Sequence, residues 1–399
     1  MTTLPLTPAS ADHGHLHCGY FERGECRSCA LLETSYGQQI TDKEAWCREI
    51  LAEAAPREWL PTFAGGVRGF RNRAKLAIGG SAGRVTLGIL DQEFHGVDLR
   101  ECGIQAPAIR AVIPVLANFL DATGLEPYDV SARRGELKFV HVTAAPSGEL
   151  MIRFVVRTQH GLDVLRSRRA RLIERVPDAS VVSVNLLPEH KAVLEGSREE
   201  MLRGESLRMN LNRVDLHLRP QSFFQTNTHV AIGLYNQVAE WVDAVESANL
   251  WDLYCGVGGF ALYCATPSRR VTGVEVSEQA IESAKISAGE LGVDARFLAG
   301  DATEFAEANL VTSTDATGPA GVERPDCVIV NPPRRGIGAR LSAALEGSGL
   351  EHIVYSSCNP TSLAKDLARM PSYQVAQARI FDMFPHTKHL EVAVLLERR

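Results

Sequence analysis

The second half of the chain, after Pro220, alternates short apolar stretches with amphipathic ones, and this alternation restricts the possible folds more than any other feature. Apolar runs bounded by turns are typical of buried parallel strands, and the stretches between them have helical spacing. We expect strands at 250–253, 271–276, 295–298, 327–330, 353–356, 374–381 and 390–396, with helices at 228–244, 277–291, 339–345 and 361–370. Seven strands ending in a hairpin-like pair predict an α/β domain with a Rossmann-like sheet over residues 219–399.

The part from about residue 63 to residue 218 has more strand signals than helix signals. We expect strands at 73–78, 85–90, 136–143, 151–158 and 180–187, and helices near 106–122 and 161–175. A cysteine-bearing loop (about 15–35) and a helical stretch (42–55) precede it, and residues 1–14 lack periodicity and are expected to be disordered. The predicted layout is therefore 1–14 disordered, 15–218 a cysteine-bearing segment with a β-rich α+β domain, and 219–399 the α/β domain.

Composition limits the function classes. Net charge is −6 over 399 residues, and the acidic excess lies in residues 219–399, with 15 Lys+Arg against 21 Asp+Glu. If a nucleic acid binds, we expect it on basic strips of the first half. No stretch reaches the length of a membrane span and the N-terminus has no export-signal pattern, so we expect a cytoplasmic protein.

A glycine turn follows the first expected strand of the α/β domain. The segment Asp252–Phe260 allows close approach of the backbone to a ligand, and Glu275, which ends the next strand, can accept hydrogen bonds from both ribose hydroxyls. Because Asp252 would repel a pyrophosphate, the acidic pocket favours S-adenosylmethionine over NAD. Asp301 is placed to meet the adenine edge or is a solvated loop residue, and Tyr254 forms a wall.

The motif Asn331-Pro332-Pro333 ends the fourth expected strand, where catalytic loops of this fold lie. Methyltransferases that act on exocyclic amines place an aromatic residue after the second proline. Here that residue is Arg334, which favours carbon as the methyl acceptor and leaves Arg334 and Arg335 for phosphates. The motif, the pocket and the seven strands together predict an S-adenosylmethionine-dependent methyltransferase domain.

Cys358 follows the strand at 353–356 and is a candidate nucleophile. Carbon 5 of a pyrimidine takes a methyl group only after a thiolate has added at carbon 6, and a base must then remove the carbon 5 proton. Glu391 precedes an apolar run that should pair beside the strand leading to Cys358, and burial there would raise its proton affinity. His386 and His389 are orienting or RNA-contacting groups, or surface histidines.

Four cysteines have the spacing of a metal site: Cys18, Cys26, Cys29 and Cys102. Four thiolates suit one [4Fe–4S] cluster or one zinc ion, and the spacing alone does not choose between them. Cys264 and Cys327 lie in apolar runs and are expected to be packing residues, and Cys47 is expected to be a bystander.

The chain resembles the RNA uracil-5-methyltransferases in five segments from about residue 18 onward: Gln221–Asn227, Asp252–Phe260, Asn331–Gly336, Ser357–Pro360 and Asp382–Glu391. The resemblance implies that Cys358 is the nucleophile and Glu391 the base. It also implies that Gln225, Tyr254, Glu275 and Asn331 line the S-adenosylmethionine site, although relatives often have phenylalanine where Tyr254 stands.

The same resemblance favours a [4Fe–4S] cluster on the four cysteines. Among these enzymes the chain is most similar to those that methylate a uridine of 23S ribosomal RNA, with no obligate protein partner implied. Two alternatives remain: a transfer-RNA uracil-5-methyltransferase, and a non-catalytic iron–sulfur protein that binds RNA or senses redox state.

Basic segments of the first half are candidates for RNA contact. Residues 69–75 and 133–138 combine positive charges with an aromatic residue or a glycine turn. The run of arginines at 166–171 lies on an expected helix and is more simply a solvated face. The target uracil must leave its stack to reach Cys358, so a loop or bulge of the RNA is expected.

Overall fold

The structure is a computed structural model that describes residues 16–191, 193–310 and 321–399, so the expected disorder of residues 1–14 concerns residues outside the described part. The described chain divides into two compact units. One, called here the α/β unit, comprises Leu31–Gly66 and Asn210–Arg399, and the other, the β-rich unit, comprises residues 16–30 and Val67–Met209. This differs from the expected layout, because residues 31–66 belong with the C-terminal part of the chain.

The α/β unit is built on an eight-stranded sheet with strand order β1-β16-β17-β15-β14-β11-β12-β13. Its strands are β1 (Glu58–Trp59), β11 (Asn249–Leu253), β12 (Arg270–Glu275), β13 (Ala295–Ala299), β14 (Cys327–Val330), β15 (His352–Ser357), β16 (Tyr373–Phe381) and β17 (Glu391–Arg398). All seven expected strands are present. The eighth, β1, pairs in parallel with β16 through Glu58 and Gln377, which is one reason why residues 31–66 join this unit.

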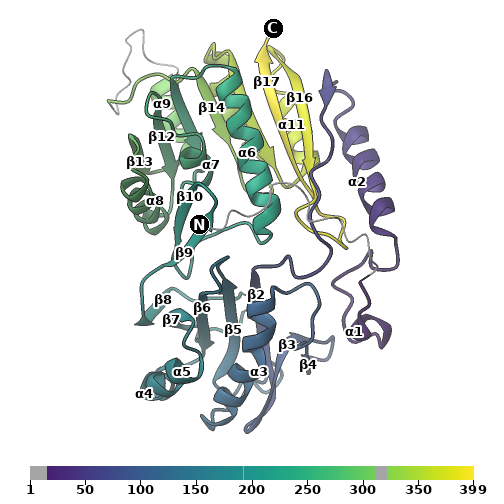
Figure 1. The fold of residues 1–399 in the computed structure, drawn as a ribbon, viewed down its shortest axis with the longest axis vertical. Helices are drawn as coiled ribbons and strands as arrows, with labels where there is room; N and C mark the ends of the chain where they lie inside the picture. Colours follow the sequence, from purple (N-terminus) through teal and green to yellow (C-terminus); the bar gives the residue numbers. More distant parts are fainter. Residues whose placement is uncertain (1–15, 192, 311–320) are drawn as a thin grey trace. The chain divides into compact units, whose positions relative to one another are not determined.

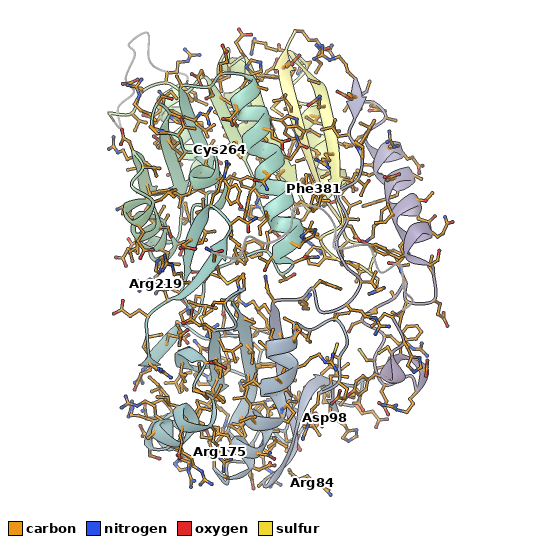
Figure 2. The ribbon with its side chains drawn as sticks, viewed as in Figure 1. Arg84, Asp98, Arg175, Arg219, Cys264 and Phe381 are labelled. Carbon is orange, nitrogen blue, oxygen red and sulfur yellow. The ribbon has the colours of Figure 1, made fainter. Side chains whose placement is uncertain are left out.

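Helices cover the sheet of the α/β unit, and Figure 1 shows α6 lying across its strands. The helices are α2 (Tyr36–Ile50), α6 (Thr228–Ala244), α7 (Gly259–Tyr263), α8 (Glu278–Leu291), α9 (Ala302–Leu310), α10 (Gly338–Gly347) and α11 (Pro360–Leu367). Asn227 accepts a hydrogen bond from the Val230 N–H and so fixes the start of α6. Cys264 and Cys327 are buried as expected, and Figure 2 marks Cys264 and the buried Phe381.

The β-rich unit contains a seven-stranded sheet with strand order β4-β3-β2-β5-β6-β7-β8. Its strands are β2 (Arg73–Ser81), β3 (Arg84–Leu90), β4 (Gly96–Asp98), β5 (Leu137–Ala144), β6 (Leu150–Val156), β7 (Ala179–Leu186) and β8 (Arg198–Arg203), and its helices are α1 (Gly19–Glu22), α3 (Pro107–Asp121), α4 (Gln159–Ser167) and α5 (Arg169–Arg175). Apolar side chains of α3 and of the sheet form its core. The α+β character is as expected, and β4 and β8 were not predicted.

A two-stranded sheet of β9 (Leu207–Leu211) and β10 (Val214–Leu218) completes the described strands. β10 packs against α8 of the α/β unit. No described helix combines the length and the apolar character that crossing a bilayer would require.

Candidate active site

The predicted site residues of the α/β unit gather at one edge of its sheet. Parallel strands present their carboxyl ends at a common edge, and there Tyr254, Glu275 and Cys358 end or follow β11, β12 and β15. β17 runs antiparallel to β15, with Val392 opposite Ser357, so its first residue, Glu391, lies beside the end of β15. The expected pairing of these two strands is confirmed.

The side chain of Glu391 is buried. Only 2% of its surface is exposed, and its Oε1 accepts a hydrogen bond of 2.7 Å from the Ser356 hydroxyl. Burial raises the pKa of Glu391 to about 7, against a smaller lowering effect of the Ser356 hydrogen bond. The carboxyl group can therefore gain or lose a proton near neutral pH, as a general base requires.

Cys358 is half-buried, immediately after β15. Burial raises the pKa of its thiol, the negative charge of Glu391 raises it further, and the guanidinium of Arg334 opposes both effects by its charge and a hydrogen bond. Cys358, Glu391 and Arg334 therefore lie within electrostatic reach of one another. The thiolate is the nucleophilic form of any cysteine, and at Cys358 the group that favours this form is Arg334.

Arg334, which the sequence assigned to phosphates, has polar partners within this site. Its Nη2 lies 3.1 Å from Nδ1 of His389, and its carbonyl oxygen accepts a 3.0 Å hydrogen bond from the Asn359 side chain. Burial and the charge of Arg334 lower the pKa of His389, so a neutral ring can accept this hydrogen bond. Asn359, the residue after Cys358, thus ties the backbone of Arg334 to the turn that carries the cysteine.

Asp366, on α11, fixes the loop that follows Asn331. Gly336 has φ +81°, and a Cβ atom there would lie 2.2 Å from Oδ2 of Asp366. The same oxygen accepts hydrogen bonds from the Ile337 N–H (2.9 Å) and the Tyr355 hydroxyl (2.8 Å). The Asn331–Gly336 turn is therefore rigid, and glycine is needed at position 336.

The glycine turn leaves room for a ligand. Tyr254, Gly256 and Gly258 all have positive φ values, of 70°, 54° and 88°. A Cβ at Gly258 would come within 3.2 Å of three packed side chains, whereas a Cβ at Gly256 would meet no atom within 4 Å. Gly258 thus serves packing, and Gly256 borders open space.

Two acidic groups, Asp252 on β11 and Glu275 at the end of β12, have unused acceptor capacity. Asp252 is fully buried, its Oδ2 accepts a 2.9 Å hydrogen bond from the Ala261 N–H, and its Oδ1 has no partner. Burial raises the pKa of Asp252 to about 8. Glu275 accepts hydrogen bonds from the Gly256 and Ser277 N–H groups, one on each oxygen, and a carboxylate has further lone pairs for ligand hydroxyls. The pair fits a ligand with an amine and a ribose.

Asp301 and Tyr254 lie close together at the same edge. Asp301 is exposed and accepts hydrogen bonds from the Thr303 and Glu304 N–H groups, at the start of α9. Burial raises the pKa of the Tyr254 hydroxyl, a hydrogen bond with Thr303 opposes this, and the charge of Asp301 adds to the rise. Asp301 thus has a structural function at α9 besides its position near the open space.

Gln225 lies in the segment before α6 and is buried. Asn331 is half-buried at the end of β14, and its N–H donates to the Leu253 carbonyl at 3.5 Å.

Phe223, near Gln225, has 71% of its surface exposed. An aromatic ring exposed to this degree is a candidate for contact with a base, and the sequence analysis did not single out Phe223.

The loop that leads to Glu391 is held by α2 (Tyr36–Ile50), the helix expected at 42–55, although the sequence did not predict this contact. Lys43 forms a buried ion pair with Asp382 (2.5 Å) and also donates to the Phe384 carbonyl. The Tyr36 hydroxyl donates to Asp382 (2.7 Å), and the side-chain oxygen of Gln39 accepts a hydrogen bond from the His386 N–H (2.8 Å). His386 is therefore a buried structural residue, whereas His389 is exposed.

The four predicted metal ligands lie in the β-rich unit. Burial raises the pKa of Cys29 to about 12, and the neighbouring thiols Cys102, Cys26 and Cys18 add to the rise. The Tyr20 hydroxyl accepts a 3.0 Å hydrogen bond from the Glu101 N–H, which ties the two cysteine-bearing segments together. The thiols thus share one neighbourhood, but within the described residues no three ligand side chains are arranged as a formed metal site.

The basic segments have different surroundings. Lys75 is exposed on β2, whereas Lys138 is buried on β5. Arg166 on α4 forms ion pairs with Asp163 and Glu200, which agrees with the simpler interpretation of that run as a solvated face.

Comparison with known proteins gives consistent results. The family model described as tRNA (Uracil-5-)-methyltransferase matches residues 35–399. Proteins from Pectobacterium carotovorum subsp. carotovorum and Halothiobacillus neapolitanus, both named 23S rRNA (uracil(747)-C(5))-methyltransferase RlmC, are 42% and 43% identical over 96% of this chain and 100% of their own length. The crystal structure of Pyrococcus abyssi tRNA (uracil-54, C5)-methyltransferase with S-adenosyl-L-homocysteine has a TM-score of 0.75 and 28% identity, and the match covers 92% of this chain and 85% of that one.

Proposed function

The chain belongs to the tRNA (uracil-5-)-methyltransferase family, and from this premise we propose that it methylates carbon 5 of one uridine in 23S ribosomal RNA, with S-adenosylmethionine as donor. The observation that carries the proposal is the electrostatic coupling of Cys358 and Glu391 on two neighbouring strands. A thiol and a buried carboxyl group in this arrangement supply the nucleophile and the base that methylation at carbon 5 needs. A ribosomal RNA substrate also implies a cytoplasmic protein.

In the proposed reaction, the Cys358 thiolate adds to carbon 6 of the uracil, a carbon–sulfur bond forms, and the electron pair of the carbon 5–carbon 6 double bond moves toward oxygen 4. The donor supplies an electrophilic methyl group, which carbon 5 attacks as the methyl–sulfonium bond breaks. Glu391 then removes the carbon 5 proton, the double bond forms again, and the Cys358 thiolate leaves. Arg334 favours the thiolate at the start and at the end of this sequence.

The donor site that we propose uses the glycine turn. The unpartnered Oδ1 of Asp252 suits the donor's amine, and the carboxylate of Glu275 suits its ribose hydroxyls. Tyr254 and Asp301 would border the adenine, and Gln225 and Asn331 would complete the site. An isothermal titration with S-adenosylhomocysteine tests this assignment, since Glu275→Ala should weaken binding strongly and Asp301→Ala only weakly.

We also propose that Cys18, Cys26, Cys29 and Cys102 hold a [4Fe–4S] cluster. The thiols raise one another's pKa, which supports a shared site. The positive charge of Arg71 acts in the opposite direction on Cys29 and would stabilise thiolates bound to a cluster. Iron and sulfide analysis after anaerobic purification tests the proposal. About four irons per chain is the expected result, and one zinc with no sulfide would replace the cluster by a zinc site.

The substrate assignment rests on relatives named as ribosomal RNA enzymes at 42–43% identity over their full length, against 28% identity for the transfer-RNA enzyme of known structure. The test is incubation of anaerobically purified protein with methyl-labelled donor and unmodified 23S ribosomal RNA, followed by mapping of the labelled nucleoside. Label in 5-methyluridine at one position of a loop or bulge is expected. Label only in transfer RNA would change the substrate, and label in neither would favour a non-catalytic RNA-binding protein.

A further inference from the structure

A cavity of about 460 Å³ lies within the β-rich unit and shares no residue with the site around Cys358. Its walls come from β2, β3, β5, the turn after β3, the segment before β5 and the segment after β7, and include Leu90, Phe94, Tyr128, Phe139 and Leu187. The size is within the range of small-ligand sites in proteins. The reaction proposed above does not use this cavity.

Apolar side chains are exposed at the cavity to an unusual degree. Among the described residues eight large apolar side chains are exposed, and three of them, Phe94 (54%), Val193 (43%) and Leu194 (41%), line this one cavity. Contiguous exposed apolar groups of this kind mark binding sites more often than single ones do.

Phe94 lies in a turn, and its backbone has a strained conformation. Phe94 has φ +66°, which is uncommon for a bulky side chain. The side chain of Asp91 maintains the turn by accepting hydrogen bonds from the Glu93 and His95 N–H groups, at 2.9 and 2.8 Å. Strain that the surroundings maintain is found mainly where it serves binding or catalysis.

The remaining groups of the lining determine what the cavity can bind. The Lys138 ammonium lies 4.5 Å from the centre of the Tyr128 ring and donates a 2.7 Å hydrogen bond to the Glu189 carbonyl. The Tyr128 hydroxyl lies 3.0 Å from Nδ1 of His190. The described lining residues thus combine three aromatic rings with lysines 138 and 191 and include no acidic side chain. Flat apolar faces, polar groups at their edges and positive charge are complementary to a nucleobase and its phosphate.

We propose that this cavity binds one unstacked base of the RNA substrate, distinct from the uridine that is methylated, with Lys191 paired to the adjoining phosphate. The proposal rests on the proposed function in requiring an RNA substrate. It adds a second anchoring point, which would select RNA that carries a further unpaired base besides the target.

The first test is Phe94→Ala, measured by the anisotropy of a labelled 23S RNA fragment that contains the target and by steady-state methylation. Base–aromatic stacking predicts that Kd and KM for the fragment rise about 5- to 150-fold, while kcat at saturating RNA is unchanged. Trp46→Ala, at an exposed aromatic residue on α2, is the matched control and should change neither constant. Unchanged Kd and KM in Phe94→Ala would overturn the proposal.

The second test identifies the base. Single abasic sites are placed along the fragment, and one of them should weaken binding to the unaltered protein while having little effect with Phe94→Ala, because the two changes remove the same contact. Abasic sites whose effects are the same in both proteins would contradict the proposal.

A benzophenone-bearing amino acid at position 94 should crosslink to one nucleotide of the fragment. Crosslinking to protein instead would make the cavity a protein-docking site and overturn the proposal. Binding and crosslinking do not require methyl transfer, so an unaltered protein that fails to methylate would contradict the proposed function without deciding this one.

Discussion

The active edge of the large sheet and the four-cysteine region both bring together residues far apart in the sequence, but they differ in what holds those residues in place. At the sheet edge, strand pairing sets the positions of Cys358 and Glu391, and Ser356 and Arg334 already interact with them. In the cysteine region, short loops carry the thiols, and their main described effect on one another is to disfavour ionisation.

The difference shows which site the protein preorganises by itself. Catalytic groups must stand in their working geometry before the substrate arrives, and hydrogen-bonded strands provide this. A set of half-buried thiols that oppose one another's ionisation is stable with protons bound or with a metal bound, so its ligand would complete it. Single side-chain substitutions should therefore abolish function at the sheet edge. The cysteine region should instead be destabilised by loss of its bound ligand.

The largest expected effect is that of Cys358→Ala at the sheet edge. Without the thiolate no bond to carbon 6 forms, and methyl transfer should fall by at least about 10⁴-fold. Transfer of a labelled methyl group to 23S RNA measures this, and donor binding, which should be unchanged, is the control. Residual activity within tenfold of the unaltered protein would rule out Cys358 as the nucleophile.

Glu391→Gln should lower the rate by about 10²- to 10⁴-fold, the usual contribution of a general base. Because the carbon 5 proton then stays in place, the covalent protein–RNA adduct should accumulate and be visible on a denaturing gel. Cys358→Ala combined with Glu391→Gln is the control and should give no adduct. Loss of methylation without any adduct in the single variant would assign Glu391 to an earlier step.

The same substitution has a pH-dependent effect on stability. The folded-state pKa of Glu391 is raised from its usual 4.5 to about 7, so its contribution to stability is fully present below about pH 4.5 and is lost as the pH rises through 7. Glutamine carries no such penalty, and at pH 8.5 the variant should be more stable by ~3 kcal/mol. Urea unfolding at pH 5 and pH 8.5 measures the difference, which should shrink at the lower pH.

The buried ion pair that holds the loop before Glu391 affects mainly stability and has a smaller effect on the rate. Lys43→Met leaves the buried Asp382 without its cation and should cost about 3–5 kcal/mol of unfolding free energy, with a lower kcat because the loop before Glu391 is loosened. Lys43→Met with Asp382→Asn should recover a large part of the stability, since asparagine still accepts from Tyr36. A loss below about 1 kcal/mol in the single variant would show that the pair does not hold the loop.

The smallest effect is expected in the cysteine region. Cys29→Ser should abolish iron binding and lower the unfolding temperature by roughly 4–8 °C, as a loss of about 2 kcal/mol would in a unit of this size. Cys47→Ala, at a buried cysteine of the other unit, should lower stability and leave the iron content unchanged. Full iron content in Cys29→Ser would remove Cys29 from the ligand set.

The elements with strong local signals were predictable. The range of α6, Thr228–Ala244, matches the prediction because Asn227 caps a long apolar helix. β1 has only two residues and thus no periodicity, and β8 has the sequence Arg-Glu-Glu-Met-Leu-Arg, whose charges do not indicate a strand. The fold explains these charges, because Glu199 and Glu200 form ion pairs with Arg153 and Arg166.

The site follows the same division. The adjacency of Cys358 and Glu391 was predictable because each adjoins an apolar strand, and the pairing of these strands brings them together. Lys43 and Asp382 are 339 residues apart, so no local pattern links them. Arg334 was assigned to phosphates from its charge, and its proximity to the Cys358 thiol became visible only in the fold.

The location of β17 has one more consequence. β17 lies between β15 and β16 inside the sheet, so the strand that begins with Glu391 is hydrogen-bonded on both sides. Interior strands exchange their amide hydrogens last, because they open only when the whole unit unfolds. Heating should therefore leave catalytic competence intact up to the cooperative melting of the α/β unit and then abolish it in one step, with no partly active intermediate.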